Sequence, residues 1–301
     1  MVCLLCGGKT KKYFQYSESY KLVQCCVCDL VQTDPMPTDD FLKDWYQKYD
    51  ILGEREPYYQ ALASDDPWST SEGLDIARQF ARIKKEFMAY GLKLMACPEI
   101  LDIGSGQGLF LDLVKRAGWE GVGIELNEKA VKMSQDRFGI KVQAGTIDSV
   151  DLGEKKFDVV ALWDIFEHVK DPLELLLKSN QLLKQEGLIF IETPNVSSFL
   201  DKIVLLLSKI GITGPAKTFY GLHHLSLWNP KNIKQALEKY GFEIKKIEQD
   251  YTPSSRVFRG KTFKDKFMRL AIGLVQMIGG AIGRENKMII IAKKVISNSR
   301  E

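Results

Sequence analysis

The sequence predicts an α/β fold in which helices flank a mostly parallel β-sheet, preceded by a small metal-binding module. Three observations lead to this prediction. Apolar segments typical of strands alternate with helical segments along most of the chain, as in consecutive β-α-β units. A glycine-rich loop at 104–108 separates one of these strands from the helix that follows it. Two Cys-x-x-Cys pairs lie within the first 28 residues.

The cysteine pairs come first along the chain and predict a zinc ribbon. Four of the six cysteines form the pairs Cys3/Cys6 and Cys25/Cys28, with 18 residues between the pairs. At this spacing each tight turn points two thiolates at the same tetrahedral ion. Four thiolates fill the coordination shell, so we expect a structural Zn²⁺ whose loss unfolds the first ~30 residues and leaves the sheet folded. The alternative is a set of unligated thiols in a reducing compartment.

The segment after the ribbon connects it to a larger domain. Residues 40–49 are expected to form a short aromatic-rich helix, and the prolines that follow indicate a linker or a lid. Apolar residues at steps of four, three and four then predict a helix over 72–90, and the lone Cys97 is expected in the core. The expected domains are 1–38 (zinc ribbon), 39–71 (helix and linker or lid) and 72–301 (the α/β domain, with helical insertions near 197–222 and 252–285).

The glycine loop predicts a nucleotide-containing cofactor. An apolar strand at 100–103 runs directly into Gly104-Ser105-Gly106-Gln107-Gly108, where glycines let the backbone approach a ligand. A second strand, at 121–124, ends in Glu125, about 20 residues past the loop, where an acid suits a ribose diol. The G-x-G-x-G spacing differs from the dinucleotide fingerprint. Asp102, two residues before the first glycine, disfavours a pyrophosphate and can bind an ammonium group.

The remaining strands complete a known pattern. They are expected at 141–144, 157–163, 188–192, 242–248 and 287–294. Seven strands in this order, ending in a hairpin-like pair, resemble the class I S-adenosylmethionine-dependent methyltransferases, whose Rossmann-like sheet is mostly parallel with one antiparallel strand. The run Phe157–Val169 resembles the fourth-strand motif of that family. The zinc ribbon resembles the module that precedes many of its bacterial members that act on small molecules.

The resemblance implies that S-adenosylmethionine is the cofactor and assigns residues to it. The glycine loop would cradle the methionine part, with Asp102 near its ammonium group, and Glu125 would bind the ribose hydroxyls. Residues after the third strand would border the adenine, although many relatives carry an aspartate where this chain has Thr146. Trp163 would lie near the sulfonium or pack in the core. The expected cofactor-binding residues are Asp102, Gly104, Ser105, Gly106, Gly108, Glu125, Leu126, Thr146, Ile147 and Trp163.

The candidate catalytic residues are two histidines and two acids. Methyl transfer to a hydroxyl requires removal of its proton, and histidine is the natural base near neutral pH. His168 closes the motif Asp164-x-x-Glu167-His168 at the end of the fourth strand, where open α/β sheets bind ligands. The two acids either orient this imidazole or share a second divalent ion with it. His224 lies where the resembled family has a histidine and is the second candidate; for each histidine the alternative is a structural role.

Charge and hydropathy suggest an anionic partner for the C-terminal third. Residues 1–195 hold 23 basic and 31 acidic residues, whereas residues 196–301 hold 19 and 8 and carry a net charge of +11. A solvated surface with unevenly spread lysines is the alternative. In 263–282 apolar residues share a helical face, and basic residues cluster at its start. This pattern predicts an amphipathic helix at a membrane surface, a lid over the acceptor, core packing or a dimer contact.

Hydropathy also bears on localisation. No uncharged apolar run reaches the ~18–20 residues that span a bilayer, and no signal peptide is visible at the N-terminus. We therefore expect a cytoplasmic protein that can associate with a membrane surface.

Together these patterns predict an enzyme that transfers a methyl group from S-adenosylmethionine to a small-molecule acceptor, which can be anionic or lipid-linked. Oxygen is favoured over carbon or nitrogen as the methylated atom, and the resemblance implies a sugar, a lipid-linked intermediate or a quinone-type metabolite. The alternatives are an RNA methyltransferase and a cofactor-binding module without catalysis. The ribbon has only a modest excess of lysines, which does not favour nucleic acid.

Overall fold

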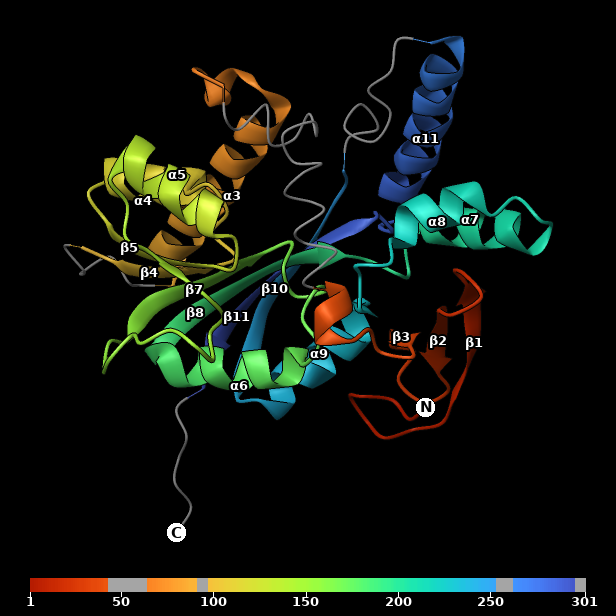
Figure 1. Cartoon of the computed structure of the whole chain (residues 1–301), viewed down its shortest axis with the longest axis horizontal. Helices are drawn as coiled ribbons and strands as arrows, with labels where there is room; N and C mark the ends of the chain where they lie inside the picture. Colours follow the sequence, from red (N-terminus) through yellow and green to blue (C-terminus); the bar gives the residue numbers. More distant parts are fainter. Residues whose placement is uncertain (43–63, 91–96, 253–261, 296–301) are drawn as a thin grey trace.

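The computed structural model describes residues 1–42, 64–90, 97–252 and 262–295 (Figure 1). Within these residues the chain forms a large α/β unit, a small N-terminal β-sheet beside it, and a group of three helices near one end of the large sheet. The helix expected at 40–49 lies mostly outside the described residues. The described end of the expected linker contains a short 3-10 helix, η1 (Pro67–Ser69).

The large sheet has seven strands within the described residues, in the order β10-β11-β8-β7-β4-β5-β6. Neighbouring strands run parallel except at β11, which is antiparallel to both of its neighbours. The strands are β4 (Glu99–Ile103), β5 (Glu120–Glu125), β6 (Val142–Ala144), β7 (Phe157–Trp163), β8 (Leu183–Pro194), β10 (Phe242–Asp250) and β11 (Lys287–Lys294). The predicted fold class, a seven-stranded, mostly parallel sheet with one antiparallel strand, is confirmed.

Helices cover both faces of this sheet (Figure 1). One face carries α3 (Ser71–Ala89), α4 (Leu109–Arg116) and α5 (Glu128–Phe138), and the other carries α6 (Pro172–Leu182) and α9 (Pro230–Lys239). Consecutive residues of β7 enter different cores: Val159 packs with residues of α3 and α4, whereas Val160 packs with residues of α6 and α9. Burial on both faces explains why the central strands are nearly continuous apolar runs in the sequence.

The parallel strands bring the expected cofactor and catalytic segments to one edge of the sheet. Strands β4, β5, β7 and β8 all end at this edge, and ligands of open α/β sheets bind beyond such strand ends. Hydrogen bonds join the segments that follow the strands. The amide of Gly104 donates to the carbonyl of Ile124 at 2.8 Å, and the amide of Asp164 donates to the carbonyl of Glu192 at 3.0 Å.

The N-terminal cysteine segment forms a second sheet that incorporates a distant strand. Its strands are β1 (Thr10–Gln15), β2 (Lys21–Cys25), β3 (Val31–Asp34) and β9 (Ser226–Leu227), paired in that order. Because β9 comes from the loop before α9, the ribbon is hydrogen-bonded to the α/β unit. Its buried Cys28 and Leu30 also belong to the same hydrophobic cluster as Trp228.

A group of three helices lies beyond the end of the sheet (Figure 1). They are α7 (Phe199–Lys209), α8 (Gly214–Tyr220) and α11 (Phe263–Ala281), and α11 contacts α7. The apolar face predicted for α11 is exposed: Phe263 is 86% accessible and Leu270 64%. Core packing is therefore the wrong interpretation of this face. Among the described residues, no helix combines the length and hydropathy needed to cross a bilayer.

The prediction for Cys97 is wrong. Its side chain is exposed, and its Sγ lies 3.3 Å from the carbonyl oxygen of Gly118. The residue precedes β4, whose apolar run starts three positions later at Ile100, so it lies outside the part of the strand that the helices cover.

Candidate active site and metal sites

The glycine loop after β4 has backbone conformations that favour glycine. Gly104, Gly106 and Gly108 have positive φ angles of 79°, 51° and 80°. A Cβ at Gly104 would lie 2.3 Å from Cγ1 of Ile165, whereas a Cβ at Gly106 would meet nothing within 4 Å. The loop is therefore closely packed on one side and open at Gly106, which lets a ligand approach its backbone.

Asp102, near the end of β4, is a buried carboxyl group with one oxygen that receives no hydrogen bond from the described residues. Its exposed fraction is 2%, and its Oδ1 has no hydrogen-bond partner among the described residues. Burial and the neighbouring Glu125 carboxylate raise its pKa to about 8. Ser105 Oγ and Gln107 Oε1 in the adjacent loop are also buried and have no partner in the part of the chain that the structure describes. Buried polar atoms of this kind are costly unless a ligand satisfies them, and a methionine ammonium group fits Asp102.

Glu125 ends β5, where the sequence predicted a ribose-binding acid. Its Oε2 accepts a hydrogen bond from the amide of Gly106 at 2.8 Å, and its Oε1 accepts one from the amide of Asn127 at 2.9 Å. Each carboxylate oxygen can accept more than one hydrogen bond, so both can also accept from ribose hydroxyls. Glu125 additionally holds the glycine loop in place, a role that the sequence did not predict.

The other expected cofactor residues lie at the ends of neighbouring strands. Leu126 is 56% exposed beside Glu125. Thr146 is exposed just after β6, and the half-buried Ile147 packs against the main core. Trp163 ends β7 with its ring against those of Phe110 and Phe190, and its Nε1 is buried without a hydrogen-bond partner in the described residues. The cofactor roles of these four residues stay predictions.

All three histidines of the chain meet beside the end of β7. His168 follows that strand, and His223 and His224 belong to the loop between α8 and β9. The ring centroids are 5.1 Å apart for His168 and His223, 4.9 Å for His168 and His224, and 4.4 Å for the adjacent pair. Sequence reasoning selected His168 and His224, and the structure adds His223. The sequence feature that could have indicated His223 is its place directly before His224, in the loop ahead of a helix.

The environment of the histidines keeps them uncharged. Burial lowers the pKa of His168 and of His224, and it lowers that of His223 to about 3. His168 Nδ1 lies 3.0 Å from the carbonyl oxygen of His223. Because a carbonyl only accepts, this nitrogen carries the proton and Nε2 keeps a lone pair. A neutral imidazole can accept a proton or bind a metal ion.

The two acids of the Asp-x-x-Glu-His motif face different partners. Glu167 is buried: its Oε2 accepts from Thr193 Oγ1 at 2.9 Å, and its Oε1 lies 3.8 Å from His168 Nε2. Burial and the nearby Asp164 raise the pKa of Glu167 to about 8. Asp164 forms an ion pair with Lys287, at 2.9 Å between Oδ2 and Nζ. Of the two acids, Glu167 is the one that approaches His168 directly.

Lys287 is a site residue that sequence reasoning missed. It starts β11, is 9% exposed, and its Nζ also lies 2.5 Å from Glu192 Oε1, an oxygen that Gln79 contacts as well. Asp164 has a φ of 51°, which side-chain-bearing residues rarely adopt, and the ion pair holds its carboxylate there. The sequence shows Lys287 only as the first residue of an apolar strand, with no signal that pairs it with Asp164.

A recess beside this ion pair opens between α3 and the ends of the strands. It is lined by Asp75, Arg78, Arg82, Glu192, Asp250, Tyr251 and Lys287. Its three basic side chains all pair with acids, so the recess does not present an unbalanced charge to an acceptor.

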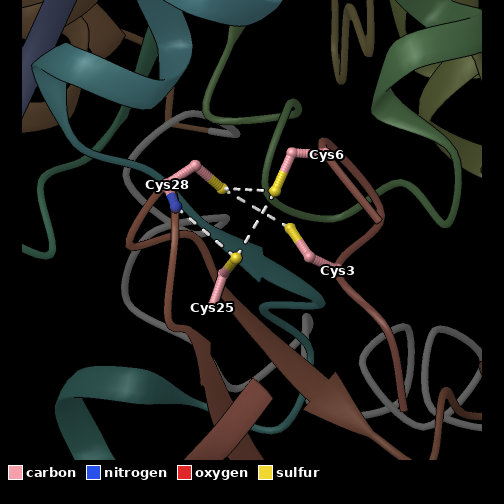
Figure 2. A group of neighbouring side chains, drawn as sticks. All are labelled: Cys3, Cys6, Cys25 and Cys28. Atoms are coloured by element: carbon pink, nitrogen blue, oxygen red, sulfur yellow. Dashed lines mark hydrogen bonds between the residues drawn. The ribbon is translucent and has the colours of Figure 1, made fainter. Parts of the chain in front are cut away.

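The four cysteines of the ribbon converge as predicted (Figure 2). The sulfurs of Cys3 and Cys28 and those of Cys6 and Cys25 are 3.5 Å apart, and those of Cys6 and Cys28 are 3.6 Å apart. A tetrahedral zinc site with Zn–S bonds of about 2.3 Å has sulfurs about 3.8 Å apart, so the cluster fits zinc with very small adjustments. Four sulfur donors leave no position for a substrate.

Comparison with known proteins defines the family. Residues 75–247, more than half of the chain, match the methyltransferase domain family. This chain belongs to that family, and the assignment that the strand order and motifs predicted is confirmed.

Particular relatives match over shorter stretches. The ubiquinone biosynthesis O-methyltransferase of Haemophilus ducreyi is 29% identical over 107 residues, which cover 32% of this chain and 45% of that protein. The protein of the same name from Ruegeria sp. is 35% identical over 153 residues, which cover 49% and 58% of the two chains. This chain therefore spans about half the length of the curated relatives it matches.

The fold is also similar to a solved methyltransferase structure. Magnesium protoporphyrin IX methyltransferase from Synechocystis PCC 6803, determined with bound SAH, superposes with a TM-score of 0.56 at 14% identity. The match covers 85% of this chain and all of that one. At this identity the similarity shows the fold alone.

Proposed function

We propose that this protein transfers a methyl group from S-adenosylmethionine to a hydroxyl oxygen of a small molecule. One observation carries the proposal: the unpartnered Asp102 beneath an open glycine loop and the cluster of three neutral histidines lie at the same edge of the sheet. The first group suits the cofactor, and the second suits a hydroxyl that must lose a proton. Membership of the methyltransferase domain family supports the first assignment.

The chain would mainly position the reactants. The cofactor supplies a methyl group on a sulfonium, and its transfer is an in-line displacement that depends on alignment and on exclusion of water. Asp102 would bind the ammonium group, and Glu125 would hold the ribose and the loop together. His168 and His224 would face the acceptor and assist the loss of its proton, with Glu167 beside His168.

The acceptor class we favour is a quinone-type metabolite with a phenolic hydroxyl. The support is the similarity to relatives that are named ubiquinone biosynthesis O-methyltransferase. Labelled S-adenosylmethionine, offered with phenols and catechols with and without isoprenoid tails and with nucleotide sugars, tests this class. Labelling of a phenolic oxygen supports the proposal, and labelling of sugars alone replaces the acceptor class. Cofactor binding without transfer to any acceptor would favour a non-catalytic module.

We also propose that α7, α8 and α11 contact an anionic membrane surface. Apolar side chains on α7, on α11 and just after each of these two helices are exposed: Leu206, Ile210, Ile212, Phe263, Phe267, Leu270, Leu274, Met277, Ile278 and Ile282. The described basic side chains on the same helices are Lys202, Lys209, Lys217, Lys266 and Arg269. The acidic side chain described on these helices is that of Asp201. It is buried and accepts hydrogen bonds from the hydroxyls of Tyr13 and Tyr220. Exposed apolar residues beside basic ones suit an anionic lipid surface.

For the ribbon we propose a structural Zn²⁺ bound by Cys3, Cys6, Cys25 and Cys28. The support is the convergence of the four sulfurs and the absence of any other ligand type in the group. Elemental analysis of protein purified without chelators tests this site, and metal-free folded protein would contradict it.

A further inference from the structure

We propose that His168, His223 and His224 bind a divalent first-row transition-metal ion, separate from the ion of the ribbon. The three histidines are the only ones in the chain, and they come from segments 55 residues apart. Each histidine has one ring nitrogen that lies within 4.8 Å of a ring nitrogen of the other two histidines. Imidazole nitrogens suit zinc, cobalt, nickel and iron.

The distances are close to those of a formed site. In a tetrahedral zinc site with Zn–N bonds of about 2.0–2.1 Å, the nitrogens lie about 3.4 Å apart. The ring nitrogens of the three histidines lie within 4.8 Å of one another, and the His168 and His223 rings are stacked, so the rings must turn and approach one another to surround one ion. The backbone segments that carry them are already adjacent, since the amide of Leu225 donates to the carbonyl of Glu167 at 2.7 Å.

Two of the rings are oriented as metal-bound histidines usually are. A metal-ligating imidazole typically donates its other ring N–H to a carboxylate or a backbone carbonyl. His168 uses Nδ1 for the His223 carbonyl, which leaves Nε2 for an ion. The His224 ring hydrogen-bonds the backbone of Tyr220, and its Nδ1 is buried without a partner in the described part of the chain. The contact must therefore use Nε2, which leaves Nδ1 for the ion.

The positions of Glu167 and Asp164 show that this site differs from one in which the Asp164-x-x-Glu167-His168 motif would bind the ion. The buried Glu167 carboxyl lies 3.8 Å from His168 Nε2 and can offset the charge of the ion or complete its coordination. Asp164 is held by Lys287 and contributes no atom to the histidine group. The three imidazoles are therefore the ligands, with Glu167 beside them.

The role of the ion rests on the proposed function. A divalent ion lowers the pKa of an oxygen ligand and can activate a hydroxyl near neutral pH. The histidines would then assist proton loss from the acceptor as ligands of the ion. Binding of the ion itself requires neither acceptor nor cofactor, so it can be measured even if the methyl acceptor is something else.

Metal content of the full-length protein tests the proposal. Wild-type protein saturated with Zn²⁺ and desalted is expected to hold two ions per chain by elemental analysis, and His223→Ala/His224→Ala is expected to hold one. Asp164→Asn is the matched control and should keep both. With Co²⁺, the ribbon should show a thiolate charge-transfer band in all three proteins. The ligand-field bands of the nitrogen site should be absent from the double variant.

The outcomes that overturn the proposal are distinct. One ion in wild type, or two ions in the double variant, would show that the histidines bind no metal. Loss of the second ion in Asp164→Asn but not in the double variant would place the metal at the acidic motif instead. Single His223→Gln and His224→Gln variants, which keep a polar side chain, repeat the count if the double variant does not fold. Each is also expected to lose the second ion.

Discussion

At the scale of one residue, the proposed contact of Asp102 with the ammonium group would link cofactor binding to proton release. Its carboxyl has a pKa of about 8 and is mostly protonated at pH 7 in the free protein. An ammonium group beside it favours the ionised form and lowers the pKa. Binding of S-adenosylmethionine at pH 7 is therefore expected to release a proton, and affinity should rise with pH up to about 8 and level off above it.

Calorimetry in two buffers of different ionisation enthalpy measures this release. Asp102→Asn is the control, because an amide of the same shape has no proton to release, and it should bind the cofactor more weakly with no buffer dependence. Equal binding enthalpies for the wild type in both buffers at pH 7 would contradict the assignment of Asp102 to the ammonium group.

The histidine cluster leads to a second prediction for single residues. His168→Ala and His224→Ala are each expected to lower turnover by roughly 10²–10⁴-fold, because on the proposed mechanism the acceptor hydroxyl would lose a group that assists its deprotonation. Cofactor affinity should stay near that of the wild type, since these rings are not part of the glycine-loop cradle. Steady-state kinetics and calorimetry on the same samples separate the two effects. Full activity in both variants would mean that the acceptor needs no such assistance.

At the scale of elements, the ribbon supports the loop that carries two of the histidines. Strand β3 pairs with β9, and the amide and Oγ1 of Thr33 donate to the carbonyls of Leu225 and His224 at 3.0 and 3.2 Å. Replacement of a proposed zinc ligand by Cys25→Ser should release β3 and loosen this loop. Amides of residues 224–228 are expected to exchange hydrogen faster, while those of β5 keep the wild-type rate. Unchanged exchange at 224–228 in zinc-free protein would contradict this support.

The exposed stripe of α11 leads to a prediction for a whole helix. The full chain is expected to sediment with phosphatidylglycerol-containing vesicles more than with pure phosphatidylcholine, and less so at high salt. Leu270→Glu/Leu274→Glu should remove most of this binding, because charges replace apolar area. Leu74→Glu on α3, where the side chain is 54% exposed, is the matched control and should bind as the wild type does.

The contrary result for α11 is equally measurable. A dimer in solution that the double variant dissociates, with no vesicle binding by the wild type, would assign the stripe to contact between two copies of the chain. Sedimentation velocity without vesicles makes this measurement.

At the scale of the whole molecule, the ribbon and the α/β unit share one core. Cys28, Leu30, Trp228, Ile233 and Phe242 belong to a single buried cluster. We therefore expect one cooperative thermal transition, and chelation of the zinc should shift that transition to lower temperature. Scanning calorimetry measures both. Two separate transitions, with only the first sensitive to chelation, would instead support the independent ribbon that the sequence alone predicted.

The local sequence pattern was sufficient to predict the strands of the sheet and the glycine-rich segment. Strands such as β4 and β7 are apolar on both faces, so burial leaves a continuous signal in the sequence. The positive φ angles of Gly104, Gly106 and Gly108 explain why the loop is glycine-rich and therefore recognisable. The cysteine spacing predicted the group of four converging thiols for a similar reason, because each pair lies within one tight turn. In each case the interacting residues are close in sequence.

The tertiary structure alone decided the features that join distant segments. Pairing of β3 with β9, the ion pair of Lys287 with Asp164, and the meeting of His223 with His168 all connect residues separated by 55 positions or more. The same holds for α11, whose apolar periodicity is equally compatible with burial and exposure. A periodic pattern identifies a helix or strand and its apolar face, but the partner of that face depends on how the chain folds back on itself.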